Sequence, residues 1–163
     1  IIFHKTLPLG IFVKVCHLGN GREIVVRLND RGPFVKGRVI DLSYAAARRL
    51  GIDSSGTGPV RVEALGYQDK GREGAPVYHP LPSYRVGSYA VQVGAFATPD
   101  NAHRVAAGLK TRYGAAVVTE GWVGGRRFYR VWVGRYGSLE AAETARVGFE
   151  RHGYPSSFVV ALD

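Results

Sequence analysis

The chain has 163 residues, 45% of them hydrophobic, a formal charge of +9, one cysteine and no methionine. A single cysteine excludes an internal disulfide and a multi-cysteine zinc site, and no apolar run is long enough to span a bilayer. The positive charge favours a polyanionic partner, but the basic residues are scattered arginines rather than one basic arm, so charge alone leaves nucleic acid, anionic lipid and an acidic wall polymer open.

Residues 11–66 carry short β-type segments and one helical segment. Residues 23–28 alternate apolar and polar side chains as a half-buried strand does, and residues 60–65 form the last such run. A helix is predicted from 43 to 50, because Ser43 is a good N-cap and Gly51 a good stop. Cys16 ends the apolar segment 11–16, which favours a buried strand thiol over a reactive one.

The motif Asn-Asp-Arg-Gly-Pro-Phe at 29–34 is the most informative of the first half. Gly32 and Pro33 break the strand before them, so Asp30 is expected at a strand end. A carboxylate at the mouth of a β-structure, backed by arginines, suits acid/base chemistry on sugars. The same residues are good turn formers, so the motif alone leaves both interpretations open. Asp41, just before the predicted helix, is a second carboxylate that suits capping or turn support equally well.

Four stretches of the first half together resemble the rare lipoprotein A family of bacterial envelope proteins. They are His-Lys-Thr-Leu-Pro-Leu-Gly at 4–10, Asn-Gly-Arg at 20–22, the motif at 29–34 and Ile-Asp-Leu-Ser-Tyr-Ala-Ala-Ala at 40–47. The resemblance covers residues 4–66, and the motifs fall in the family's order without large gaps. It implies an all-β double-psi β-barrel and a lytic transglycosylase that acts on peptidoglycan strands without stem peptides.

The resemblance also implies roles for particular residues. Asp30 is the expected acid and base, and His4 is its expected partner, holding a substrate hydroxyl or the carboxylate. Arg31 is expected to point away from Asp30 or to bind the glycan, because an ion pair would lower the pKa of an acid. Family members carry a Gly-rich stretch with a glutamate and a first barrel strand ahead of the position of His4, so we expect an N-terminally truncated, incomplete barrel. No cofactor and no metal are expected.

Residues 67–87 show neither helical nor strand periodicity. They are rich in glycine, proline and charged side chains, which is typical of a linker. The sequence therefore predicts three parts: a barrel domain of catalytic type at 1–66, a linker at 67–87 and a second domain at 88–163.

The second half contains an internal repeat. Val-Gln-Val-Gly-Ala-Phe at 91–96 recurs as Val-Trp-Val-Gly-Arg-Tyr at 131–136, and each copy is followed by a segment of helical period. The first helix is expected to start at residues 98–100 and the second to be capped by Ser138, and strands are expected at 116–120 and 157–161. The pattern predicts a βαββαβ ferredoxin-like antiparallel sheet with both helices on one face.

Strand alternation predicts which side chains lie on the open face of this sheet. Phe128, Arg130 and Trp132 share one side of the third strand, and Gln92 of the first strand is expected beside them. Exposed aromatic, cationic and amide groups on a flat sheet form a stacking and hydrogen-bonding platform for a ligand. A packing face against the first domain or a second copy of the chain is the alternative.

The second half resembles the SPOR domain over residues 88–162, with 91–96 and 129–134 as its two signature strands. That resemblance implies binding of glycan strands stripped of peptides at the septal wall of dividing bacteria. An RNA-recognition domain uses the same sheet, but its third strand needs glycines that residues 127–132 lack, so nucleic acid is not the expected partner.

Together the resemblances imply an endolytic lytic transglycosylase that cleaves MurNAc-GlcNAc bonds in denuded strands, leaves 1,6-anhydroMurNAc ends and is targeted to the division septum. The expected location is the periplasmic cell envelope, with an outer-membrane anchor through a lipid-modified cysteine ahead of this segment, and the expected state is a monomer. The alternative is a non-catalytic peptidoglycan-binding envelope protein of cell division, whose barrel grips the strand without cutting it.

Overall fold

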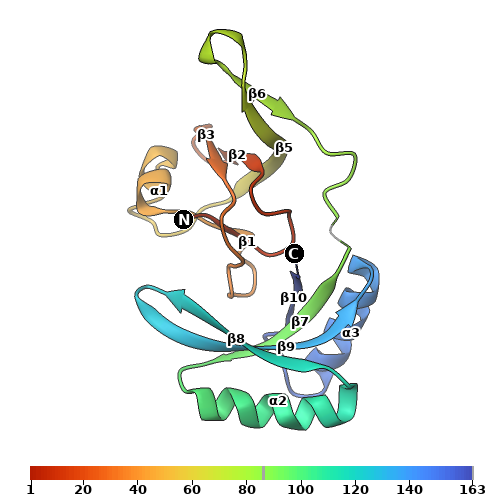
Figure 1. The fold of residues 1–163 in the computed structure, drawn as a ribbon. Helices are drawn as coiled ribbons and strands as arrows, with labels where there is room; N and C mark the ends of the chain where they lie inside the picture. Colours follow the sequence, from red (N-terminus) through yellow and green to blue (C-terminus); the bar gives the residue numbers. More distant parts are fainter. Residues whose placement is uncertain (86, 163) are drawn as a thin grey trace. The chain divides into compact units, whose positions relative to one another are not determined.

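The computed structural model describes residues 1–85 and 87–162 and divides the chain into two units, Ile1–Arg85 and Val86–Asp163 (Figure 1). Each unit has its own hydrophobic core. No helix within the described ranges combines the length and the hydropathy that a bilayer crossing requires.

The first unit is built mainly of strands. Its elements are β1 (Phe3–His4), β2 (Phe12–His17), β3 (Glu23–Arg27), β4 (Ile40–Asp41), α1 (Tyr44–Leu50), β5 (Val60–Lys70), the 3-10 turn η1 (Arg72–Gly74) and β6 (Pro76–His79). An antiparallel sheet has the order β3-β2-β5-β6, and β1 pairs with β4 separately. Ile11, Val13 and Val15 are fully buried beside Leu28 and Leu50, so the inward side of β2 carries the core.

The predicted helix at 43–50 is confirmed as α1. The Ser43 hydroxyl accepts a hydrogen bond from the Ala46 N–H at 3.4 Å, which caps the first turn. Gly51 ends the helix at a φ of 80°, a left-handed conformation that glycine adopts without steric cost. The predicted buried strand thiol is also confirmed, since Cys16 lies in β2 and is 5% exposed.

The linker predicted at 67–87 is wrong for most of its length. β5 continues through Lys70, and β6 pairs with it in register from Tyr67 and His79 to Lys70 and Pro76. Further along, Leu81 and Tyr84 pack against the core of the first unit. The hairpin was hidden in the sequence because its strand residues are mostly polar and exposed, so no alternation marks it.

The second unit has the predicted βαββαβ order. Its elements are β7 (Tyr89–Phe96), α2 (Pro99–Tyr113), β8 (Ala116–Val123), β9 (Arg126–Tyr136), α3 (Leu139–Arg151) and β10 (Phe158–Ala161). The sheet has the order β10-β7-β9-β8 with every neighbouring pair antiparallel, and α2 and α3 cover one face of it (Figure 1). The sequence repeat therefore corresponds to the two central strands, β7 and β9.

The core of the second unit lies between the sheet and the helices. Val91, Val131 and Val133 are fully buried, and they pack with Leu109 of α2 and Phe149 of α3. This confirms the predicted side of each central strand that faces the helices. The Ser138 hydroxyl accepts from the Ala141 N–H at 3.1 Å, so the predicted cap of α3 is also present.

Candidate functional site

Asp30 lies just beyond the end of β3, beside the short strand β1. The His4 N–H donates to the Asp30 carbonyl oxygen at 3.1 Å, and the Asp30 N–H donates to Ile2 at 3.3 Å, which makes a parallel bridge between Phe3 and Asp30. The Asp30 side chain is exposed, and one carboxylate oxygen accepts from the Arg31 N–H at 2.7 Å. The strand-end position expected for this carboxylate is therefore present, and the group is open to a ligand.

The His4 ring is held in one orientation by its own loop. Its Nδ1 accepts hydrogen bonds from the Thr6 N–H at 3.2 Å and the Leu7 N–H at 3.0 Å. Burial, together with the positive charges of Arg31 and Lys5, lowers the pKa of His4 to about 4. The ring is consequently neutral near pH 7 and carries its proton on Nε2, which makes it a hydrogen-bond donor.

Arg31 is buried against the loop that carries His4. It is 5% exposed, and its Nη1 donates to the backbone carbonyls of His4 and Leu7. The guanidinium therefore lies against the 4–7 loop. Its burial favours a role in holding the His4 loop over the substrate-binding role predicted for it, because a glycan reaches exposed groups.

Asp41 occupies the other side of β1. Phe3 pairs with Asp41 in the β1–β4 ladder and with Asp30 in the parallel bridge, so ordinary strand spacing puts the two acidic residues about 10 Å apart at their Cα atoms. Ser43, not Asp41, caps α1, and Asp41 accepts instead from Arg38 at 3.1 Å. Burial raises the pKa of Asp41, against the opposing charges of Arg38 and Lys5. Sequence reasoning missed this environment, because pairing with β1 leaves no local pattern.

The candidate ligand face of the second unit is organised by a contact between its central strands. Gln92 of β7 and Trp132 of β9 are register partners, and the Trp132 indole N–H donates to the Gln92 side-chain oxygen at 3.0 Å. Gln92 is 2% exposed, so the prediction of an outward, exposed glutamine is wrong in its exposure. The indole N–H engages the acceptor oxygen of the buried amide, and Trp132, which is half-buried, is the more accessible of the two.

Arg130 also differs from the exposed position predicted for it, since it is 5% exposed. Its guanidinium lies directly on Gly121 of the neighbouring strand β8, where any side chain would collide with it. Phe128 is half-buried, and the Arg126 guanidinium lies 5.9 Å from its ring centroid. The predicted residues thus share one face of the sheet, with Phe128 and Trp132 more accessible than Gln92 and Arg130.

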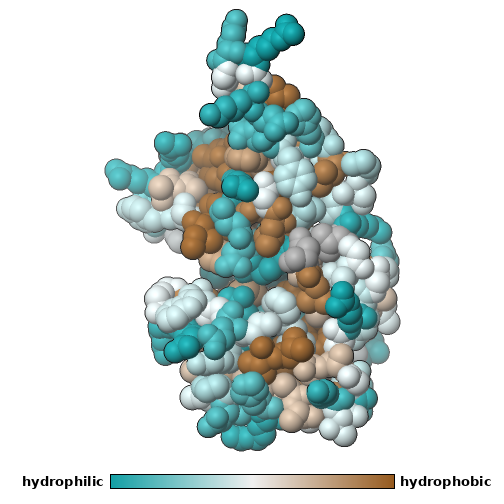
Figure 2. Space-filling model, in the orientation of Figure 1, coloured by the Kyte–Doolittle hydropathy of each residue, from teal (hydrophilic) through white to brown (hydrophobic). Residues whose placement is uncertain are grey.

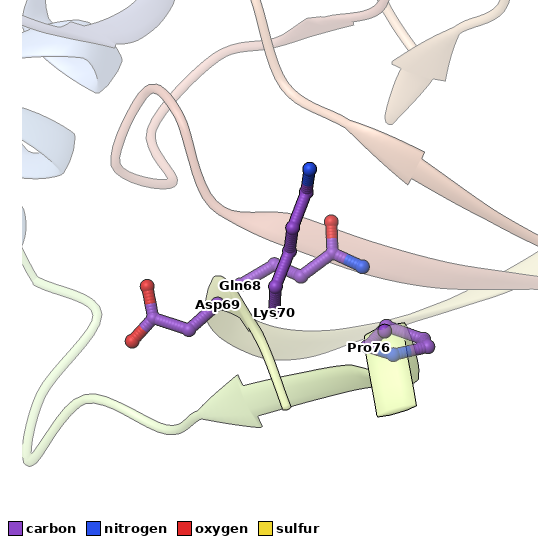
Figure 3. A pocket seen from close by; sticks show the side chains of 5 residues that line it. Gln68, Asp69, Lys70 and Pro76 are labelled. Carbon is purple, nitrogen blue, oxygen red and sulfur yellow. The ribbon is translucent and has the colours of Figure 1, made fainter. Parts of the chain in front are cut away.

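The part of the chain that the structure describes offers no cluster of three or more histidine, cysteine or acidic groups that could hold a metal ion. A hollow of about 350 Å³ lies at the β5–β6 hairpin, lined by Gln68, Asp69, Lys70, Gly74 and Pro76 (Figure 3). None of these is a predicted site residue. Beside the hollow, the His79 ring lies 3.0 Å from the Asp69 carboxylate.

Comparison with known proteins connects both units to one family. A family model described as lytic transglycolase matches residues 3–62, and the SPOR domain model matches residues 86–161. The endolytic peptidoglycan transglycosylase RlpA of Vibrio cholerae is 31% identical over 98% of this chain and 58% of its own length. This chain belongs to the RlpA family.

Other RlpA proteins agree with this assignment. RlpA of Campylobacter jejuni is 40% identical over 66% of this chain and 44% of its own length. RlpA of Pasteurella multocida is 59% identical over 42% of this chain and 24% of its own length. The chain thus spans about half the length, or less, of these relatives. The predicted fold class is confirmed, since a double-psi-barrel-type domain precedes a SPOR domain in this chain.

Proposed function

We propose that this chain is an endolytic lytic transglycosylase of the bacterial cell wall, in which the first unit cuts the glycan strand and the second unit binds it. The observation that carries the proposal is that both halves of the chain match domains that occur together in proteins named peptidoglycan transglycosylases. Two separate sequence signals therefore point to one polymer, and the chain combines an exposed carboxylate with a platform of aromatic side chains.

In the proposed reaction the Asp30 carboxyl group moves one proton twice. It first donates its proton to the glycosidic oxygen between N-acetylmuramic acid and N-acetylglucosamine, so the C1–O4 bond breaks and a 4-hydroxyl leaves. The sugar's own 6-hydroxyl then attacks C1, and Asp30 accepts the proton of that hydroxyl. The carboxyl group is restored, no water is added, and the new end is a 1,6-anhydro sugar.

His4 supports this chemistry as a neutral donor. Because its Nδ1 is occupied by backbone N–H groups, the Nε2–H is the group that remains to hold a substrate hydroxyl beside Asp30. The hydrogen bond from the His4 N–H to the Asp30 carbonyl also links the two positions through the backbone. Asp41 is the second carboxyl group beside β1, and its ion pair with Arg38 favours a supporting role.

We propose that the second unit prefers strands that have lost their stem peptides. Removing a peptide leaves a free lactyl carboxylate on the muramic acid, so a denuded strand is narrower than an intact one and carries a negative charge directly on its sugar backbone. The chain's charge of +9 and Arg126, which lies beside Phe128, complement that charge. Trp132 and Phe128 supply accessible aromatic surface against which the apolar face of a sugar ring can stack.

This substrate choice gives the proposed location. Denuded strands arise where amidases remove peptides during division, so binding to them would concentrate the protein at the septum, on the periplasmic side of the envelope. We further propose that the full-length protein is held at the outer membrane by a lipid-modified cysteine, and that the chain acts as a monomer.

The test uses sacculi treated with amidase to remove stem peptides, beside untreated sacculi. Soluble products are identified by mass spectrometry, and protein retained in the wall pellet is measured in the same samples. Anhydro-ended sugars released from the stripped wall alone are the expected result. Retention in the pellet without any product would contradict the enzymatic proposal and support a non-catalytic binding protein.

A further inference from the structure

The hairpin between β8 and β9 carries an exposed aromatic cluster that has no part in the proposed ligand face. Trp122 is 60% exposed, and the Arg127 guanidinium lies 5.6 Å from its ring centroid. The same guanidinium lies 5.9 Å from the ring of Tyr129. One arginine thus bridges two aromatic rings along the hairpin, an arrangement that holds the rings in place and leaves the indole open to solvent.

This cluster lies on the side of the sheet that carries the helices. Trp122 and Arg127 are register partners, as are Gly121 and Phe128, so the two pairs project from opposite faces. Tyr129 packs against the core beneath the helices, which fixes the face of the cluster. The hairpin reaches beyond α2 (Figure 1), so the helix does not cover this end of the sheet.

The hairpin is therefore two-sided. On the open face the Arg126 guanidinium lies 5.9 Å from the Phe128 ring, and on the helix side Arg127 lies against Trp122. Each face of this pair of strands therefore carries one arginine beside an aromatic ring. Gly124 and Gly125 close the hairpin with φ angles of 56° and 76°, a tight turn that brings both sides to the tip.

The electrostatics of the cluster favour a polyhydroxylated ring over an anionic surface. Glu120 lies 3.5 Å from Arg127, so the patch is close to neutral and offers both acceptors and donors. A carboxylate at this place would be repelled by an anionic membrane. Figure 2 agrees with this mixed character, since this end of the second unit shows mostly pale and teal surface rather than a brown patch.

We propose that the Trp122–Arg127 surface is a second glycan-binding site, which takes a pyranose ring of N-acetylated wall glycan by stacking on the indole, with Arg127 and Glu120 bonding its hydroxyl groups. The proposal rests on the proposed function, because the polymer is the same. Two sites on opposite sides of one hairpin let the second unit contact two strands, or two stretches of one strand, at the same time. Binding to a multi-stranded wall then exceeds binding to a single short strand.

The experiment measures binding of soluble, amidase-stripped glycan strands to the whole chain. Trp122→Ala is compared with the wild type and with Val25→Ala, which removes an exposed apolar side chain from β3 of the first unit. We expect about tenfold weaker binding for Trp122→Ala, as for an exposed aromatic anchor, and no change for Val25→Ala. Arg127→Lys, which keeps the charge and loses the planar group, is expected to weaken binding in the same direction.

Fluorescence identifies the surface directly, because the chain has only two tryptophans. The emission change of the wild type minus that of Trp122→Phe reports Trp122 alone, and we expect a shift to shorter wavelength on adding stripped strands. If the wild type binds strands, Trp132→Ala loses binding and Trp122→Ala binds as the wild type does, this inference is overturned and the proposed function stands. A wild type that binds no strands overturns the proposed function as well. If the Trp122 emission shifts on adding phosphatidylglycerol vesicles but not on adding glycan, the surface binds lipid and the inference is overturned.

Discussion

The His4 N–H donates to the carbonyl oxygen of Asp30 at 3.1 Å, which joins two positions that are 26 residues apart in the sequence numbering. The bond forms one side of the parallel bridge between Phe3 of β1 and Asp30. It ties the expected acid and its expected partner to one piece of backbone, so displacement of the 4–7 loop would also displace Asp30.

Replacing Asp30 with Asn is expected to lower release of anhydro-ended sugars by at least about 100-fold, since general acid/base catalysis contributes on that scale. Because the side chain is exposed, the thermal midpoint and the retention of protein on stripped sacculi should stay as in the wild type. Product analysis and pelleting on the same preparations check this. Loss of binding in Asp30→Asn, with product release retained by the bound fraction, would reverse the roles of the two units.

Replacing Asp41 with Asn is expected to lower product release less than tenfold, because its carboxylate is engaged with Arg38 and its removal leaves Asp30 in place. Burial raises the pKa of Asp41 above the ordinary value of an aspartate, which makes Asp41 the residue to test as an alternative acid. The two variants are compared at one pH under the conditions that give the wild type its highest rate. If Asp41→Asn released no anhydro-ended sugars while Asp30→Asn remained active, Asp41 would be the acid.

The lowered pKa of His4 predicts that the stability of the first unit depends on pH. Its pKa falls from the ordinary 6.5 to about 4 in the folded chain, so between these values the unfolded chain binds the extra proton. Stability is therefore full above pH 6.5 and falls as the pH drops toward 4, by no more than about 3 kcal/mol. Urea unfolding between pH 7 and pH 4.5 measures this decline. In His4→Asn, whose amide oxygen can accept the loop N–H groups, the decline should be smaller; an equal decline would rule out His4 as its source.

Gly121 is expected to govern the ligand face of the second unit through Arg130. A Cβ at this position would collide with the Arg130 guanidinium, which is the flexible end of a side chain and can move aside. Gly121→Ala should therefore fold with a loss of less than about 1 kcal/mol while it weakens binding to stripped strands about fivefold. Gly108→Ala on α2, where a Cβ meets open space, is the matched control and should bind as the wild type does. Equal binding by both variants would show that the position of Arg130 is unimportant.

Gly66 tests the hairpin that replaces the expected linker. It has a φ of 99°, and a Cβ there would collide with the backbone carbonyl of His79. Gly66→Ala should destabilise the first unit by about 2 to 4 kcal/mol, because neither the strained φ nor a backbone atom can yield easily. Gly56→Ala, also at a positive φ but in open space, is expected to lose only about 1 kcal/mol. If chemical unfolding shows that both variants lose the same free energy of unfolding, that result would argue against a packed hairpin at 66–79.

The sequence was sufficient where structure depends on local pattern. The caps of α1 and α3 follow from single hydroxyls, and the order of the second unit follows from a repeat that alternation places on β7 and β9. It failed where structure depends on contacts between distant segments. The β5–β6 hairpin has exposed polar strands, and the burial of Gln92 and Arg130 depends on an indole and on a glycine in other strands.

The candidate site shows the same division. The strand-end position of Asp30 was predictable because Gly32 and Pro33 end the pairing locally. The environment of Asp41 was not, because it arises from pairing with Phe3 and an ion pair with Arg38. The orientation of the His4 ring, which depends on two backbone N–H groups of its own loop, likewise has no signature in the sequence.

The central claim is that the sugar's own hydroxyl, not water, attacks the cleaved bond. The direct measurement is cleavage of peptide-stripped glycan strands in water enriched in heavy oxygen, followed by mass spectrometry of the new ends. We predict ends that are lighter by one water than a hydrolysis product and that contain no heavy oxygen, formed by the wild type and absent with Asp30→Asn. Heavy oxygen in the new ends would show hydrolysis and contradict a lytic transglycosylase.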